Sequence, residues 1–265
     1  MRMFSIASGS SGNCIYVGNE DTHVLVDIGI SGKRVIEGLA QINLALHDID
    51  AILITHEHID HIKGLGVILR KCPIPVYATP KTIDAILQNS CIGKVDKALF
   101  GEIVPDHNFS IKTLFVNASS TWHDAADPVC YSFSDSSGKM SVVTDLGDFD
   151  DYLIHKLKRS DVMLVESNHD VRMLQANQRY TYALKQRILG KRGHLSNERS
   201  GELMVQLTKA YPMKAIVLGH LSNDNNIPEC ALINMQNYMD SAGINRNDML
   251  IQVAERERYS VDISI

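Results

Sequence analysis

Apolar runs of strand length alternate with helical patterns through the first third of the chain. Residues 15–17 and 22–27 are mostly apolar and flank a polar turn at 18–21, a pattern typical of two neighbouring strands. Apolar positions recur at helical spacing over 31–47, which predicts a helix, and the apolar run 49–54 predicts a buried strand. The alternation continues with a helix over 64–70, a strand over 73–78 and a helix over 80–88.

From residue 99 onwards strands make up more of the predicted pattern. We expect two or three strands over 99–116. Single strands are then predicted over 128–133, 141–147 and 215–219, and a buried strand that ends in a polar cluster is predicted over 162–170. Helices are predicted over 171–177, 184–190 and 228–241. Residues 249–253 and 259–263 are typical of a closing hairpin, and we interpret its charged tip at 255–258 as a solvated turn.

The composition limits the class of protein. With 265 residues, of which 45% are hydrophobic, the chain can bury a substantial core as one large domain or two small ones. It has neither an apolar run long enough for a membrane span nor a signal-peptide pattern, so we expect a cytoplasmic protein. The five cysteines are scattered and form no CxxC pair, which indicates a reducing compartment. A net charge of -5 argues against a broad nucleic-acid surface but allows a local basic patch.

A histidine-rich loop follows the apolar run 49–54 and has the composition of a metal site. Its residues are Thr55-His56-Glu57-His58-Ile59-Asp60-His61. On a tight loop His56 and His58 can converge on one ion, whereas Asp60 and His61 can turn toward a second. Imidazole and carboxylate ligands suit Zn, Mn or Fe rather than a metal that prefers thiolates. We therefore predict two bound divalent metal ions.

This HxHxDH run resembles the signature of the metallo-β-lactamase superfamily, and the resemblance extends over the whole chain. It implies an α/β (α+β) fold in the form of a four-layer αββα sandwich, in which helices flank two sheets. The alternation of predicted strands and helices is compatible with that architecture. The same scaffold carries lactamases, glyoxalases, lactonases, phosphodiesterases and nucleases, so other residues have to decide the function.

The resemblance also implies the other residues of a two-metal site. Asp27, in a VDxG element, would brace the metal loop without being a ligand. His123 stands where the superfamily has the third histidine of one metal. Asp145, in a TDxG element, would bridge both metals, and His220 would be the last ligand. The implied set is His56, His58 and His123 for one ion, Asp60, His61 and His220 for the other, and Asp145 for both.

In the RNase Z and PhnP branches of the superfamily, a histidine that is not a ligand is proposed to protonate the leaving oxygen. His194 matches that histidine by order along the chain, and Glu166 matches the glutamate that partners it in RNase Z. An alkoxide leaving group of high pKa needs such an acid, and a nearby carboxylate would raise the pKa of His194. We therefore expect Asp60, His194 and Glu166 to be needed for catalysis. Alternatively, His194 is bonded to backbone beside a helix N-cap.

Six motifs together look like the bacterial YycJ (WalJ) family: ASGSSGNC, THEHxDHxxGL, TDLG, ESNHD, GHLSN and GHLSxxNN. Members of that family are associated with 5′-to-3′ exonuclease action on double-stranded DNA, and the resemblance implies this activity here. Asp145 and His220 are only 75 residues apart, too few for the β-CASP domain that related nucleases insert between these positions. We expect a single domain over residues 1–265.

Several polar residues could contact a phosphate or another part of the substrate. The candidates are Ser10 and Asn13 in the loop 7–14, Asn168 and His169 after a predicted strand, and Lys191 and Arg192 in a basic cluster before His194. The glycine-rich loop could turn its backbone amides toward an anion, or it could be an ordinary hairpin turn. The basic cluster could meet a DNA backbone, or it could be an ordinary helix surface. With one tryptophan in the chain, we do not expect an extensive base-stacking platform.

The mechanism that we expect is two-metal hydrolysis of phosphodiester bonds, with DNA ends as the substrate and His194 as the acid. One alternative is a hydrolase of small cyclic phosphodiesters, thioesters or lactones, which would use the same metals and suits the negative net charge. Another is a non-hydrolytic redox or binding protein. An oxygen-reducing diiron member normally has an acidic residue in place of His58, which argues against the redox alternative. The sequence does not specify an oligomeric state.

Overall fold

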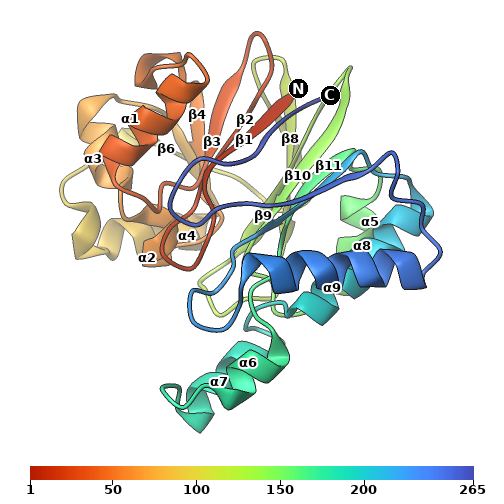
Figure 1. The fold of residues 1–265 in the computed structure, drawn as a ribbon. Helices are drawn as coiled ribbons and strands as arrows, with labels where there is room; N and C mark the ends of the chain where they lie inside the picture. The colour runs from red at the N-terminus through yellow and green to blue at the C-terminus, as the bar shows by residue number, and fades with distance from the viewer.

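The structure is a computed structural model that describes residues 1–265, and its centre is a pair of seven-stranded sheets lying face to face (Figure 1). The first sheet has the order β14 (Asp262–Ser264), β1 (Arg2–Ala7), β2 (Cys14–Gly18), β3 (His23–Val26), β4 (Ala51–Leu53), β5 (Val76–Ala78) and β6 (Phe100–Glu102). The second has the order β13 (Leu250–Val253), β12 (Ala215–Gly219), β11 (Val162–Glu166), β10 (Gly138–Val143), β9 (Val129–Asp135), β8 (Leu114–Ser120) and β7 (Asn108–Ile111).

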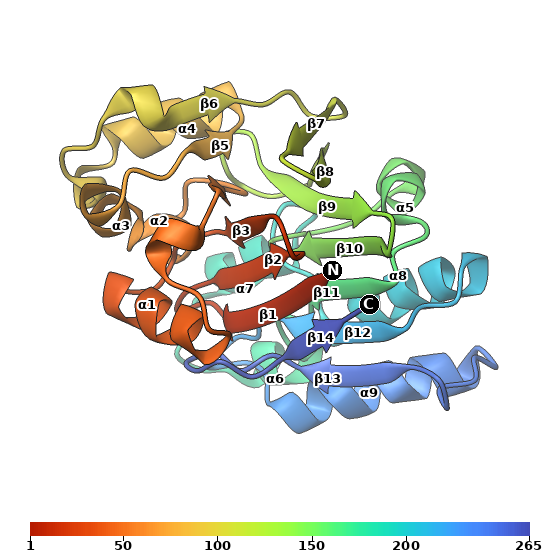
Figure 2. The same cartoon turned by 90° about the horizontal axis from the view of Figure 1, so that it is seen from above.

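Helices cover the outer faces of both sheets and make four layers (Figures 1 and 2). On the first sheet lie α1 (Gly32–Gln41), α2 (Ile59–Ile62), α3 (Leu65–Lys71), α4 (Pro80–Gln88) and the short 3-10 helices η1 (Leu46–Asp48), η2 (Ser90–Ile92) and η3 (Lys97–Leu99). On the second lie α5 (Asp151–Leu157), α8 (Asn197–Ala210) and α9 (Pro228–Ser241). A pair of helices, α6 (Val171–Ala176) and α7 (Tyr182–Leu189), protrudes as an arm. The predicted αββα sandwich is confirmed.

Strand β12 illustrates why the sequence forms these layers. All five of its residues are buried. Ala215 and Val217 pack into the cluster between the sheets, whereas Ile216 and Leu218 pack under the helices of the second sheet. A strand that is covered on both faces needs an uninterrupted apolar run, as the sequence has at 215–219. None of the helices is both long enough and apolar enough to cross a membrane.

Two predicted elements differ from the structure. The helix expected over 31–47 ends at Gln41, and Asn43 then adopts a left-handed backbone with φ 60°, which a right-handed helix cannot continue. The predicted closing hairpin is wrong. Strand β13 pairs in parallel with β12 in the second sheet, whereas β14 pairs antiparallel with β1 in the first. Between them the chain crosses from one sheet to the other, because Ala254 and Val261 are buried in the cluster between the sheets.

Parallel strands bring their carboxyl ends to one end of the sandwich. Strands β3 and β4 are parallel in the first sheet, and β10, β11 and β12 are parallel in the second. The loops that follow these strands therefore meet, as is usual for the active sites of α/β proteins. They carry Asp27, His56, Asp145, the polar cluster after Glu166, and His220.

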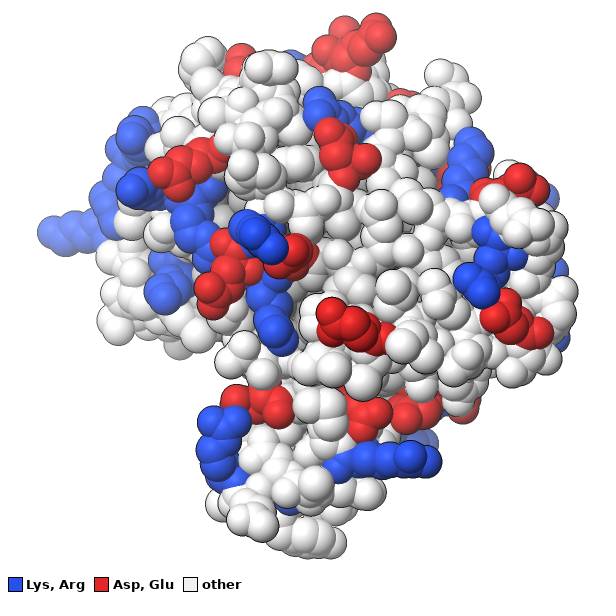
Figure 3. Space-filling view, in the orientation of Figure 1, with Lys and Arg blue, Asp and Glu red and all other residues white.

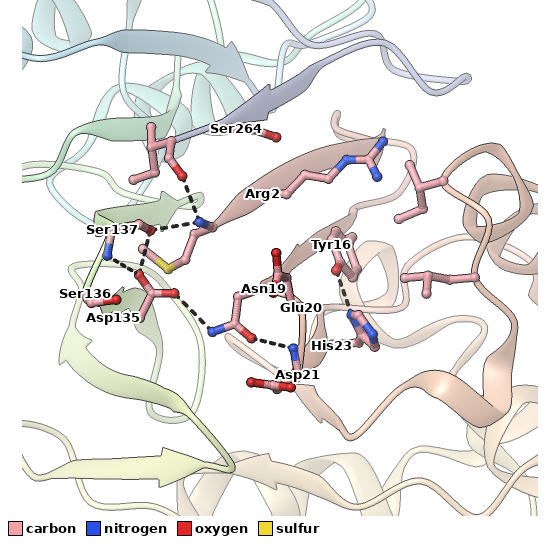
Figure 4. A pocket seen from close by; sticks show the side chains of 14 residues that line it. Arg2, Tyr16, Asn19, Glu20, Asp21, His23, Asp135, Ser136, Ser137 and Ser264 are labelled. Carbon is pink, nitrogen blue, oxygen red and sulfur yellow. Dashed lines mark hydrogen bonds between the residues drawn. The ribbon is translucent and has the colours of Figure 1, made fainter.

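A cavity of about 600 Å³ lies at the opposite end of the sandwich, around the start of β3 and near the chain termini (Figure 4). Its polar side chains bond to one another. The Tyr16 hydroxyl lies 2.8 Å from His23 Nδ1, and the Asn19 side-chain amide donates to Asp135 at 3.0 Å. The second of these bonds joins the turn between β2 and β3 in the first sheet to β9 in the second sheet.

Candidate metal centre

The histidine-rich loop leaves β4 and turns almost at once into α2. His56 and His58 lie before the helix, and His58, with φ -62° and ψ 150°, is its N-cap residue. Asp60 and His61 lie within the single turn of α2. The change from extended to helical backbone separates the two pairs of side chains, which join different groups of partners.

The first group consists of His56, His58 and His123, whose ring nitrogens lie within 4.8 Å of one another. His123 donates its Nδ1 proton to the carbonyl oxygen of Gly193 at 2.9 Å, so its Nε2 has a free lone pair. This Nε2 lies 3.3 Å from His58 Nδ1, and the buried Nε2 of His56 has no hydrogen-bond partner. Three ring nitrogens that converge in this way fit a divalent cation.

The second group consists of Asp60, His61 and His220. Asp60 Oδ2 lies 3.4 Å from His220 Nε2 and 3.5 Å from His61 Nε2. Asp145 reaches both groups, since its Oδ2 lies 2.9 Å from His61 Nε2 and its Oδ1 lies 3.5 Å from His123 Nε2. The buried Oδ2 of Asp145 has no hydrogen-bond partner and is therefore available to a cation. This donor set of nitrogen and carboxylate oxygen fits a pair of divalent ions.

Asp27 holds the histidine-rich loop in place through hydrogen bonds to two of its residues. Its Oδ2 accepts hydrogen bonds from His61 Nδ1 at 2.7 Å and from the Thr55 hydroxyl at 2.9 Å, and its Oδ1 accepts from the Thr55 backbone N–H at 2.9 Å. Because Nδ1 of His61 holds the proton, Nε2 is the atom left to bind a metal. This is the place in the centre that the family resemblance implies for Asp27.

Glu166 is fully buried and holds two histidines at once. Its Oε1 accepts from Nδ1 of His194 at 2.8 Å and from Nδ1 of His220 at 2.7 Å. Its Oε2 accepts from the backbone N–H groups of Leu146 at 2.8 Å and Leu195 at 3.1 Å. Both histidines therefore direct Nε2 away from Glu166. His220 faces Asp60, and His194, with its side chain 24% exposed, lines a cavity of about 200 Å³.

The buried charges control protonation in the metal-free protein. Burial opposes the charged form of His220, but the carboxylates of Asp145, Asp60 and Glu166 outweigh it and raise its pKa to about 10. Burial would raise the pKa of Glu166, but its bonded histidines lower it to about 2. Burial would also lower the pKa of His194, yet the Glu166 carboxylate raises it. Since a ligand histidine must be neutral, metal binding has to displace protons from this centre.

Three of the predicted substrate contacts, Ser10, Lys191 and Arg192, are exposed, and a fourth, Asn168, is 5% exposed. Ser10 and Asn168 line the cavity beside His194, and the Asn168 side-chain amide also donates to the backbone carbonyl of His220 at 3.0 Å. Lys191 and Arg192 are exposed, and Lys191 Nζ lies 5.7 Å from the ring centroid of Trp122.

The other two predicted contacts, Asn13 and His169, are about 1% exposed. The Asn13 side chain bonds to the backbone of Gly9 and lies 3.1 Å from His61 Nε2. Neither ring nitrogen of His169 has a partner. Both side chains are buried and therefore inaccessible to a bound molecule in this conformation. This burial disagrees with the prediction that Asn13 and His169 contact the substrate.

Three features of the centre were not predicted. Ser222, two residues after His220, also lines the cavity. Arg187 of α7 belongs to the basic cluster expected to meet a DNA backbone, but its pairing with Asp124 at the rim, where its Nε donates at 2.5 Å, was not predicted. Arg256, interpreted above as part of a solvated turn, donates to the backbone carbonyl of Ser222 at 2.7 Å and packs so closely on Gly9 that a Cβ there would lie 2.5 Å from its Cγ. The motif around His220 pointed to Ser222, but no local pattern links residue 256 to it.

Known proteins with similar sequences and folds can be compared with this site. A family model described as the beta-lactamase superfamily domain matches residues 22–221. Exodeoxyribonuclease WalJ of Streptococcus pneumoniae (strain D39) is 40% identical over 239 residues, which cover 90% of this chain and 88% of that protein. Exodeoxyribonuclease YycJ of Bacillus anthracis is 38% identical over 246 residues, covering 90% and 89%. The crystal structure of Zn(2+)-bound PqqB from Methylobacterium extorquens has the same fold, with a TM-score of 0.74 and 15% identity over 100% of both chains.

Proposed function

Because the chain belongs to the beta-lactamase superfamily and, within it, to the family of the WalJ and YycJ exodeoxyribonucleases, we propose that it is a metal-dependent exodeoxyribonuclease. It hydrolyses phosphodiester bonds of double-stranded DNA, starting from a 5′ end. The observation that supports a phosphodiester substrate most directly is the hydrogen bond of 2.8 Å between His194 and Glu166, which supports a role for His194 as an acid beside the proposed metal ligands.

Seven side chains would hold two divalent ions, which we propose to be Zn or Mn, or Fe. They are His56, His58 and His123 for one ion, Asp60, His61 and His220 for the other, and Asp145 for both. Bound there, two such ions supply an activated water and neutralise the phosphoryl oxygens. The protein fixes the geometry through Asp27, which orients His61, and Glu166, which orients His220.

His194 acts on the leaving group. Its Nδ1 is held by Glu166, so Nε2 is free to donate a proton to the sugar oxygen as the bond from phosphorus to that oxygen breaks. Glu166 is a positioning residue, because it reaches the reaction only through the two histidines that it bonds. Its negative charge also favours the protonated imidazole that an acid must be before transfer.

The proposed DNA strand approaches between the arm and the histidine-rich loop. Figure 3 shows basic side chains on both sides of the protruding arm. Arg187, Lys191 and Arg192 are exposed near the cavity beside His194. These few cations can hold phosphates of a strand end without reading its bases, which predicts little sequence preference. All five cysteines are free, as suits an enzyme that meets DNA in the reducing cytoplasm.

The test is hydrolysis of linear duplex DNA, labelled at either end, by purified protein with added Mn. Stepwise release of a 5′ label is expected. Asp60→Asn should abolish activity through loss of metal, and His194→Ala should keep its metals while turnover falls by about two to four orders of magnitude. Loss of metal from His194→Ala would contradict its role as the acid. Turnover of a small phosphodiester without attack on DNA would instead favour a small-molecule phosphodiesterase.

A further inference from the structure

A cavity of about 200 Å³, here called the His194 pocket, opens between α7 and the loops that follow β1, β11 and β12. His194 lines it, but none of the seven metal ligands does. In an in-line displacement at phosphorus, the attacking and leaving oxygens lie on opposite sides of the phosphorus atom. A cavity that borders the acid and not the metal ligands therefore lies on the leaving-group side.

The size of the His194 pocket limits what the leaving group can be. Pockets that hold drug-sized ligands measure about 300–1,000 Å³. A volume of about 200 Å³ therefore has room for one nucleotide with part of it in solvent, and not for a strand of several nucleotides.

The walls of the His194 pocket have two different characters. Leu184 and Ile188 of α7 form an apolar wall, which suits the carbon face of a sugar or base. Ser10 and Ser222 present hydroxyl groups on the other side. The Oγ of Ser222 already accepts bonds from two backbone N–H groups, at 3.3 and 3.2 Å, so its own proton is free to donate to an oxygen of a ligand.

The Arg187–Asp124 pair forms the far boundary of the His194 pocket. It joins α7 to the loop between β8 and β9, and both of its side chains line the pocket. Only Nε of Arg187 is used in the pair, and its two terminal nitrogens remain free to donate to a phosphate in bidentate geometry. A strand end that fills the pocket would present its terminal phosphate to this guanidinium.

From these features we infer that the His194 pocket is the subsite for the 5′-terminal nucleotide, and that Arg187 binds its 5′-phosphate. The inference rests on the proposed exonuclease function. The oxygen of water bonds to phosphorus, the bond from phosphorus to O3′ of the terminal nucleotide breaks, and His194 gives its proton to that O3′. The products are a 5′-mononucleotide and a shortened strand with a new 5′-phosphate, which is the form that Arg187 recognises in the next turnover.

The test compares duplexes that carry a 5′-phosphate or a 5′-hydroxyl, using wild type, Arg187→Ala and Arg187→Lys in the metal-loaded protein. The wild type should prefer the phosphorylated end by about 10- to 100-fold in kcat/KM, as expected for a charge-assisted hydrogen-bond pair. Arg187→Ala should lose this preference, and Arg187→Lys should restore part of it. Arg246→Ala, which removes an exposed ion pair with Asp240 in the segment after α9, should behave as wild type.

A second variant tests the size limit independently of the charge. Leu184→Trp fills the apolar side of the His194 pocket, so it should lower turnover of DNA more than turnover of bis(p-nitrophenyl) phosphate. A wild-type preference that survives in Arg187→Ala, or a wild type without any preference, would overturn the subsite alone. A wild type that hydrolyses bis(p-nitrophenyl) phosphate but neither duplex would overturn the exonuclease function, and the subsite with it.

Discussion

Replacing Glu166 by glutamine tests whether one buried carboxylate serves both the acid and a metal ligand. The substitution keeps the shape of the side chain but leaves one oxygen and one NH2 group. Glu166 now accepts four hydrogen bonds, two from histidine rings and two from backbone N–H groups. Whichever way the glutamine amide is turned, two N–H donors must face its NH2 group.

The magnitude follows from these lost bonds. A buried donor left without a partner costs about 1–3 kcal/mol, so Glu166→Gln should lower the free energy of unfolding by about 2–6 kcal/mol in the metal-free protein. If the oxygen stays with the backbone, His220 loses the partner that orients it, and removal of such a partner typically lowers metal affinity about 10- to 100-fold. His194 loses the carboxylate that raises its pKa, so turnover should fall nearly as far as in His194→Ala.

The assay combines three readouts on Glu166→Gln, His194→Ala and the exposed control Glu257→Gln. They are metal titration, turnover of bis(p-nitrophenyl) phosphate with saturating metal, and urea unfolding without metal. Glu166→Gln should be impaired in all three, His194→Ala mainly in turnover, and the control in none. Wild-type metal affinity in Glu166→Gln would refute the reasoning, because the metals alone would then suffice to orient His220.

Three further predictions follow from the same contacts. Metal binding should release protons, because a metal must displace the proton of His220, whose pKa is raised to about 10. In titrations between about pH 6 and pH 8, the metal affinity should therefore rise by up to about tenfold per pH unit for each proton displaced. A metal affinity that does not change with pH would contradict this. Burial lowers the pKa of His169 from 6.5 to about 4, so the neutral ring favours the folded state above pH 6.5 and this stability is lost as the pH falls toward 4. Between about pH 7 and pH 4.5, the free energy of unfolding of metal-free His169→Leu should therefore fall by about 2–3 kcal/mol less than that of the wild type. Equal decreases would mean that His169 does not cause the acid sensitivity. Gly9→Ala and Arg256→Ala should each lower DNA turnover, and the double variant should lower it by less than the sum of the two effects. The coupling in a double-mutant cycle should be about 0.5–3 kcal/mol. Strictly additive effects would mean that the close contact between the two residues does not contribute to turnover.

The part of the candidate centre that the sequence predicts most directly is the part whose residues are close together in the chain. Four of the seven candidate ligands lie within His56–His61, and the spacing of that loop already implies two groups of side chains. The other candidates follow apolar runs, and parallel strands must bring their carboxyl ends together. Both features can be identified in a single sequence, because the ligand types and the strand pattern each depend on consecutive residues.

The contacts that could not be predicted join segments far apart in the sequence. The last two strands flank a charged tip, a pattern that favours a hairpin. In the structure, Ala254 and Val261 are buried between the sheets, and the two strands belong to different sheets. That crossing brings Arg256 onto Gly9 and Ser222. The burial of Asn13 likewise depends on contacts with the histidine-rich loop, in addition to its bonds with the nearby Gly9 backbone. The places of these residues depend on packing between distant segments, which local sequence propensities do not predict.

Three residues of the centre, Asp27, Asp145 and His220, hold left-handed backbone, with φ of 61°, 54° and 55°. This conformation costs about 1–3 kcal/mol for a residue other than glycine, although aspartate and histidine tolerate it better than most. Each follows the end of a strand and lies next to a bond from another element. The His220 N–H donates to Ser8 Oγ, and the N–H after Asp145 donates to Glu166.

At Asp145 and His220, glycine would relieve this strain but remove the proposed ligand, and alanine would keep the strain and still remove it. At Asp27, which is not a proposed ligand, either change would remove the carboxylate that orients His61. The bonds from Ser8 and Glu166 therefore hold strained backbone as well as orienting ligands. Substitutions in these two residues should lower stability and metal affinity together. Substitutions of His56 and His58, which are not in the left-handed region, should mainly lower metal affinity.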